Sequence, residues 1–210
     1  MEKRPKINRA RTYSDLMQQK ANVLPFSGEW EESVGQPELT GSWLIWGNRS
    51  NGKTRFAMQL CKYFAHFVKV AYNSLEEGAS VSIRKAVKEV GMDEVKNNFL
   101  LLDKEPIEDL KIRLRKRNAP RVIFIDSWQY TGLNYQEYIR LINEFRHTIF
   151  VIVSHADGIN PAGRTAKSIN YDAFVKIRVE GYMAFPASRF GGNEPYTIWH
   201  EGAEKYYGNK

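Results

Sequence analysis

Residues 47–54 read GNRSNGKT and fit the pattern G-x-x-x-x-G-K-[ST] of a phosphate-binding loop. The apolar run SWLIW at residues 42–46 precedes the loop and predicts a buried strand. After the loop, apolar residues recur at helical spacing, at Phe56, Ala57, Leu60 and Phe64. Strand, loop and helix therefore follow one another in the order that a phosphate cradle needs, and we expect a nucleoside triphosphate as the occupant.

The residue types of the loop explain that expectation. Gly47 and Gly52 let the backbone curl so that successive N–H groups point at phosphate oxygens, at the positive end of the next helix. Lys53 reaches the outer phosphates as a point charge, and the Thr54 hydroxyl ligates Mg²⁺. The alternative is a chance match in a glycine-rich turn. The residues expected to bind ATP are Gly47, Asn48, Arg49, Ser50, Asn51, Gly52, Lys53 and Thr54.

Length and composition limit the remaining possibilities. The 210 residues suit one α/β domain with an appendage. The single cysteine, Cys61, lies in the predicted helix as a small core residue, which excludes disulfides and cysteine-rich zinc modules. No apolar stretch is long enough to cross a bilayer and no signal peptide is seen, so we expect a cytoplasmic protein without a membrane partner. The net charge of +7 slightly favours nucleic acid as a partner.

The chain divides into two parts at about residue 40. Residues 1–39 comprise a basic arm, a short helix over residues 14–21 and a Pro/Gly-punctuated linker over residues 25–37. The arm either touches phosphates or is a disordered tail, and the helix is a candidate for docking on a neighbouring subunit. Residues 40–210 form the predicted core.

The core has an α/β pattern with a central sheet flanked by helices. After the strand at 42–46, further strands are predicted at 68–73, 98–103, 122–126 and 148–153, followed by an antiparallel extension at 173–179, 182–185 and 196–200. The expected sheet is therefore mixed and mostly parallel. Ligands bind at the carboxyl ends of such strands.

Three of these strand ends carry candidate site residues. Asp126 closes the fourth strand and is expected to hold Mg²⁺, although a strand-ending aspartate also caps turns. Glu76 or Glu77 follows the second strand and orients the attacking water, unless the pair only complements the dipole of the next helix. His155 ends the fifth strand and can donate a hydrogen bond to the γ-phosphate.

Residues 156–170 form a predicted loop at the same edge of the sheet. The loop is too long and too polar for a simple connector. Because it carries Arg164 and Lys167 among glycines, we expect it to contact DNA, with a role as a nucleotide gate as the alternative.

Residues 40–207 resemble the RecA-type ATPase superfamily, and within it most closely the RadA/Sms recombination ATPases and the ATPase domain of DnaB replicative helicases. The sequence SLE at 74–76 matches the DnaB pattern, and EE at 76–77 answers the RadA S-G-E-E-S. DSWQYT at 126–131 is similar to D-S-I-Q-T, and His155 matches the histidine of G-H-V-T. Weaker parallels are Ala162-Gly163 with Asp172, and Arg189-Phe190-Gly191 with the end of K-N-R-F-G.

This resemblance implies more than the residues do alone. It implies Mg-dependent ATP hydrolysis with Glu76 as the catalytic base, and a sheet with strand order 3-2-4-5-1-6-7-8. It also implies a homo-oligomer, as a ring or a filament, that acts on single-stranded DNA, with Arg189 completing the ATP site of the neighbouring subunit. The alternative for Arg189 is an ion pair with a surface carboxylate.

The sequence also departs from these families. Ala187 stands where both have a lysine, and Ala156-Asp157 lacks the lysine that RadA places after its histidine. Either γ-phosphate sensing or DNA contact is therefore expected to be modified. The zinc finger and protease-like domain of RadA and the N-terminal domain of DnaB are absent, so the expectation is an ATPase core alone.

Three functions follow in order of preference. The first is an ATPase, stimulated by DNA, that serves recombination, repair or replication. The second is a regulatory assembly switch, similar to KaiC, that hydrolyses ATP slowly and acts through a protein partner. A P-loop kinase for a small metabolite is weaker, because the sequence shows no arginine-rich lid and no acceptor-binding pattern.

Overall fold

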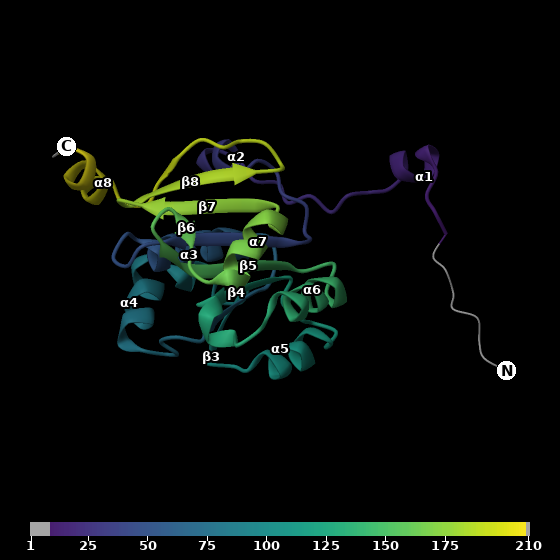
Figure 1. Ribbon diagram of the computed structural model, residues 1–210, viewed down its shortest axis with the longest axis horizontal. Helices are drawn as coiled ribbons and strands as arrows, with labels where there is room; N and C mark the ends of the chain where they lie inside the picture. The colour runs from purple at the N-terminus through teal and green to yellow at the C-terminus, as the bar shows by residue number, and fades with distance from the viewer. Residues whose placement is uncertain (1–8, 209–210) are drawn as a thin grey trace.

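A twisted central sheet organises the computed structural model, which describes residues 9–208 (Figure 1). Its strands are β1 (Ser42–Gly47), β2 (Val70–Ser74), β3 (Phe99–Asp103), β4 (Val122–Asp126), β5 (Ile149–Asp157), β6 (Asn160–Pro161), β7 (Val175–Glu180), β8 (Met183–Ser188) and β9 (Tyr196–Thr197). The helices are α1 (Tyr13–Met17), α2 (Glu29–Val34), α3 (Lys53–Ala65), α4 (Val81–Glu89), α5 (Ile107–Leu114), α6 (Tyr135–Glu144), α7 (Arg164–Asp172) and α8 (His200–Tyr207), with short 3₁₀ turns at Met92–Val95 and Trp128–Thr131.

The strands lie in the order β3-β2-β4-β5-β1-β7-β8-β9, and β6 pairs with β5 outside this path. The pairs from β3 to β7 are parallel, whereas β7–β8 and β8–β9 are antiparallel. The predicted order 3-2-4-5-1-6-7-8 is therefore confirmed once the small β5–β6 hairpin is set aside. The expectation of a mixed, mostly parallel α/β sheet is also confirmed.

Two apolar layers hold the sheet between the helices. Every residue of β1 is buried, with Trp43 and Ile45 in one core cluster and Leu44 and Trp46 in the other. A parallel strand that is covered on both faces needs an apolar residue at every position, which explains the unbroken run in the sequence. Helix α3 packs in the first cluster, and α5 and α6 contribute to the second.

The predicted linker at residues 25–37 is wrong, because this segment folds onto the core. It contains α2, and Phe26 and Val34 are almost completely buried. Trp30 stacks on Tyr196 with ring centroids 4.4 Å apart. The glycines that suggested a linker instead flank the helix, where Gly28 and Gly35 have positive φ.

The N-terminal helix is shorter than predicted and starts earlier. Helix α1 ends at Met17, and its N-cap is Thr12 rather than Ser14, in a capping box with Asp15. Figure 1 shows α1 standing apart from the body of the molecule. Residues 1–8 of the basic arm lie outside the described residues.

Two C-terminal predictions also need correction. Residues 156–170 are not a simple loop: β5 continues to Asp157, β6 forms a hairpin with it, and α7 begins at Arg164. Ala166 and Ile169 are buried, so helical spacing gives α7 an inner face that the polar composition concealed. The strand predicted at 196–200 is only two residues long, and α8, which we did not predict, follows it.

Within the described part of the chain, no helix combines the length and the hydropathy that a membrane span requires.

Candidate nucleotide-binding site

The phosphate-binding loop joins β1 to the N-terminus of α3. A side chain at Gly47 would overlap the carbonyl oxygen of Val179 on the adjacent strand, so this position requires glycine. Gly52, with φ of 94°, is the N-cap of α3 and supplies no side-chain cap. The N–H groups of the first helical turn are therefore left for another acceptor, and an anion at this end also gains from the helix dipole.

Two contacts fix the shape of the loop. The Asn51 side chain accepts a hydrogen bond from Gly181 N–H at 2.7 Å, and Tyr182 N–H donates to the Asn51 carbonyl at 3.2 Å. Lys53 Nζ donates to the Asn48 carbonyl at 2.8 Å, which folds the lysine back over the loop. Burial lowers the pKa of Lys53, while the nearby Asp126 carboxylate opposes that shift. The ammonium is thus held in a partly dehydrated place where a phosphate would compensate its lost hydration.

A cavity of about 240 Å³ opens between the loop and the ends of β2, β4 and β5. It brings together side chains from widely separated parts of the sequence, namely Arg49, Ser50, Lys53, Thr54, Ser74, Glu76, Glu77, Asp126, Ser127 and His155. The predicted catalytic and metal-binding residues therefore converge, with the exception of Arg189.

Asp126 lies at the floor of this cavity. The Tyr72 hydroxyl, on the neighbouring strand β2, donates a hydrogen bond to Asp126 Oδ2. Burial raises the pKa of Asp126 to about 6, and the hydrogen bond from Tyr72 opposes this rise. The sequence did not reveal Tyr72 as a site residue, because it points inward from the middle of a strand, where a tyrosine is normally a core residue.

The structure separates the two glutamates that the sequence left as a pair. Ser127 Oγ donates to Glu76 Oε2 at 3.0 Å, and His155 Nε2 lies 3.4 Å from the same oxygen. The Glu76 N–H also contacts the Asp126 carbonyl at 3.2 Å. Glu77 is more exposed and accepts a hydrogen bond from Ser80 Oγ at 3.1 Å, beside the N-cap of α4. Glu76 is thus the glutamate that adjoins Asp126, and Ser127 is a further site residue.

The donor set fits a magnesium ion that is bound mainly through a nucleotide. Among residues 9–208 no group of three or more His, Cys, Asp or Glu side chains is arranged to hold a metal ion. Mg²⁺ commonly takes one or two protein oxygens and completes its octahedron with phosphates and water. Thr54 and Asp126, which both line the cavity, are the residues that would supply those oxygens.

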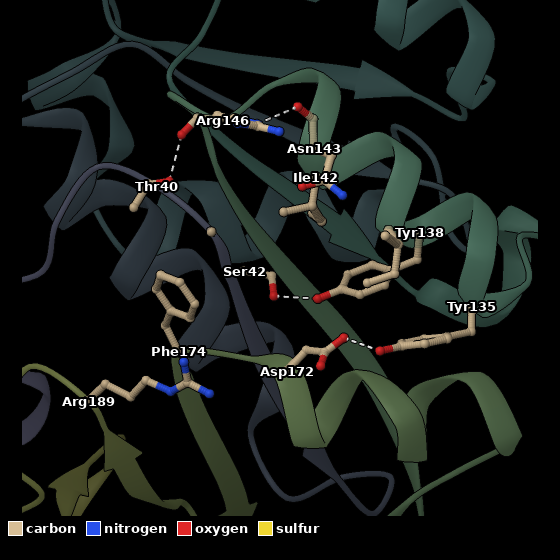
Figure 2. Close-up of a pocket in the computed structure, with 12 residues that line it drawn as sticks. Thr40, Ser42, Tyr135, Tyr138, Ile142, Asn143, Arg146, Asp172, Phe174 and Arg189 are labelled. Atoms are coloured by element: carbon tan, nitrogen blue, oxygen red, sulfur yellow. Dashed lines mark hydrogen bonds between the residues drawn. The ribbon is translucent and has the colours of Figure 1, made fainter. Parts of the chain in front are cut away.

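Arg189 lies at the opposite edge of the sheet. Because β8 is antiparallel to β7, Ser188 pairs with Val175, whereas Gly47 pairs with Val179 at the nucleotide edge. Four strand residues separate these levels, or about 13 Å. Figure 2 shows Arg189 beside a second cavity, of about 410 Å³, with its guanidinium 4.9 Å from the Phe174 ring. Within the described residues it forms no ion pair, so the surface-carboxylate alternative is not observed.

The two predicted nucleic-acid residues also lie outside the nucleotide cavity. Arg164 and Lys167 are exposed on α7, and Lys167 Nζ is 3.3 Å from Asp157 Oδ2. Gln129 connects this region to the site, because its amide donates to Ser154 Oγ at 2.8 Å and to the Ala162 carbonyl at 3.2 Å.

No protein-family profile and no curated protein matches the sequence. Several solved structures are similar in fold. The flagellar accessory protein FlaH from Methanocaldococcus jannaschii aligns with a TM-score of 0.56 at 16% identity, over 84% of each chain. A KaiC-like protein from Pyrococcus horikoshii OT3 gives 0.55 at 18% identity, over 81% of this chain and 87% of that one.

The ATPase domain of a DnaB-family protein gives a TM-score of 0.52 at 17% identity, over 73% of this chain and 78% of that one. At these identities the likeness concerns the fold alone. The fold of this chain is that of the RecA-like P-loop ATPases.

Proposed function

We propose that this chain binds Mg·ATP in the cavity beside the phosphate-binding loop and hydrolyses it. One observation carries the proposal: the Glu76 carboxylate lines the same cavity as Lys53, Thr54 and Asp126, and Ser127 holds it there. A P-loop alone only binds phosphate. A carboxylate fixed at the end of the neighbouring strand adds the general base that hydrolysis requires.

The residues of the cavity have separate tasks in this scheme. The loop N–H groups and Lys53 bind and orient the phosphates, which already have most of the geometry that transfer to water demands. Glu76 accepts a proton from the attacking water, and His155 and Ser127 keep its carboxylate oriented. Mg²⁺, held through Thr54 and Asp126, supplies charge neutralisation on the phosphate oxygens when bound.

Arg189 belongs to this function only across a subunit boundary. It lies at the edge of the sheet that faces away from its own loop. We propose that it enters the ATP site of a neighbouring copy in a homo-oligomeric ring or filament. A guanidinium supplied in this way cancels charge that develops in the transition state.

We propose single-stranded DNA as the partner. The support is the net charge of +7 and the two exposed cations Arg164 and Lys167 on α7. This helix follows the β5–β6 hairpin, and His155 of β5 lines the ATP cavity. A change at the nucleotide is thereby placed close to the helix proposed to touch DNA.

The test is phosphate release from Mg·ATP by the purified protein, with and without a single-stranded oligonucleotide. Hydrolysis that DNA accelerates, and that Lys53→Ala abolishes, is the expected result. Slow hydrolysis that DNA leaves unchanged would favour the regulatory assembly switch. No ATP binding at all would overturn the proposal.

A further inference from the structure

A small aromatic surface adjoins the phosphate-binding loop on the side away from Glu76. It consists of Trp199, Tyr182 and Arg55. The Tyr182 and Trp199 rings meet edge to face, with centroids 5.0 Å apart and an interplanar angle of 87°. The Arg55 guanidinium carbon lies 5.5 Å from the centre of the Trp199 ring. Arg55 directly follows Thr54 in the first turn of α3.

Several contacts fix this surface relative to the loop. Tyr182 lies against Gly52, since a side-chain carbon at Gly52 would be 3.1 Å from the Tyr182 ring. Both hydrogen bonds that anchor Asn51 go to Gly181 and Tyr182. Further along α3, Gln59 Nε2 donates to the Ile198 carbonyl at 3.1 Å, next to Trp199. The aromatic surface therefore moves with the loop and with the first turns of α3.

Trp199 differs from the buried tryptophans of the described residues. Trp43, Trp46 and Trp128 are at most 9% exposed and belong to the two core clusters. Trp199 is 37% exposed although it is the N-cap residue of α8 and contributes no capping side chain. Neither packing nor capping therefore accounts for the exposed part of this large ring.

We propose that Trp199 and Arg55 form the base-binding subsite for the nucleotide whose phosphates the loop holds. This inference rests on the proposed function, because it needs ATP in the loop. A nucleotide anchored by its phosphates at the N-terminus of α3 must direct its sugar and base past the first turn of that helix. Arg55 and Trp199 are there, and base rings stack on both indole and guanidinium planes.

The chemistry of the subsite predicts its selectivity. Its recognition elements are an aromatic face and a guanidinium rather than a set of donors and acceptors aimed at a base edge. Stacking of this kind tolerates any base, because every base has a π-face. A purine overlaps the indole more than a pyrimidine does, so ATP and GTP should bind similarly well and more tightly than CTP.

The test compares ATP, CTP and inorganic tripolyphosphate as ligands, by titration calorimetry, for the whole chain and its variants. Tripolyphosphate contacts the loop but has no base. Trp199→Ala should raise the Kd for ATP by about 5- to 150-fold, which is the usual effect of losing one stacking partner. The Kd for tripolyphosphate should stay unchanged, and the preference for ATP over CTP should disappear.

Controls separate stacking from folding. Trp199→Phe should keep most of the ATP affinity, and Arg55→Ala should weaken ATP but not tripolyphosphate. Tyr171→Ala, which truncates an exposed aromatic residue on α7, should change neither Kd. The inference is wrong if Trp199→Ala leaves the ATP Kd unchanged, or if ATP and tripolyphosphate weaken equally in both Trp199→Phe and Arg55→Ala. If the unmodified chain binds neither ligand, the proposed function fails first and this inference fails with it.

Discussion

At the scale of single residues, Asp126 stabilises a ligand site at the expense of the fold. Burial raises its pKa to about 6 from an ordinary value of 3.8, despite the hydrogen bond from Tyr72. The folded chain therefore holds this proton more tightly than the unfolded chain does. Stability contributed by the neutral form is present below pH 3.8 and is lost as the pH rises through 6.

Replacing this carboxylate should consequently stabilise the protein in the absence of ligand. Asn keeps an oxygen that can accept the hydrogen bond from Tyr72 but removes the buried charge. A shift of about two pKa units predicts that Asp126→Asn raises the free energy of unfolding by about 2–3 kcal/mol at pH 8, and by less at pH 5. Urea denaturation at both pH values measures this. A variant that is less stable at pH 8, or equally affected at both values, would contradict the explanation.

The assignment of roles to residues shows what the sequence could and could not provide. Lys53, Thr54 and Asp126 were predictable, because local motifs and strand ends determine where they lie. The choice between Glu76 and Glu77 was not, because Ser127 and His155 reach Glu76 from strand ends that follow it by 51 and 79 positions in the sequence. Tyr72 was hidden for the same reason, since its partner is on another strand.

At the scale of elements, the largest differences from the prediction are in α2 and α7. Both are short helices in polar or glycine-punctuated segments, and each has only a few buried positions. Sequence periodicity needs several turns to be visible, and tertiary packing can stabilise helices of one or two turns that propensity alone would not. The long apolar strands, by contrast, were found with only small shifts at their ends.

Helix α7 leads to a prediction on DNA binding. Arg164 and Lys167 are exposed on one element and separated by three residues, so they can contact neighbouring phosphates. The variant Arg164→Gln/Lys167→Gln should lower the salt slope of log K for single-stranded DNA by about 0.7 per lost contact. Fluorescence anisotropy at several salt concentrations measures the slope.

A matched control uses two cations on a different helix. Arg84→Gln/Lys88→Gln on α4 removes the same charge and should leave the slope of the unmodified chain. Equal slopes for both double variants would mean that the contact is elsewhere, with the basic arm as the next place to test.

At the scale of the whole molecule, the sheet places the proposed catalytic groups at two opposite edges. Glu76 and the loop lie at the carboxyl ends of the parallel strands, and Arg189 lies near their amino ends. A single copy therefore does not bring Arg189 to its own ATP site. This separation was invisible in the sequence, where Arg189 was grouped with the other catalytic residues.

A mixing experiment tests whether two copies complete one site. Glu76→Gln and Arg189→Ala should each be defective, with Arg189→Ala lowering the rate by about 10³- to 10⁵-fold. Mixing them should restore part of the activity, because some interfaces then combine an intact Glu76 with an intact Arg189. Absence of rescue, together with sedimentation that shows only monomers with ATP and DNA, would refute the role of Arg189 across an interface.

The most direct measurement for the central claim compares ATP binding with ATP hydrolysis in Glu76→Gln and Glu77→Gln. Glu76→Gln keeps the loop and the Mg²⁺ ligands, so it should bind Mg·ATP with nearly unchanged Kd while hydrolysis falls by about 10²- to 10⁴-fold. Glu77→Gln, which removes a charge from the neighbouring exposed residue, should retain most of the hydrolysis rate. Normal hydrolysis by Glu76→Gln, with the loss found instead in Glu77→Gln, would contradict the site as described.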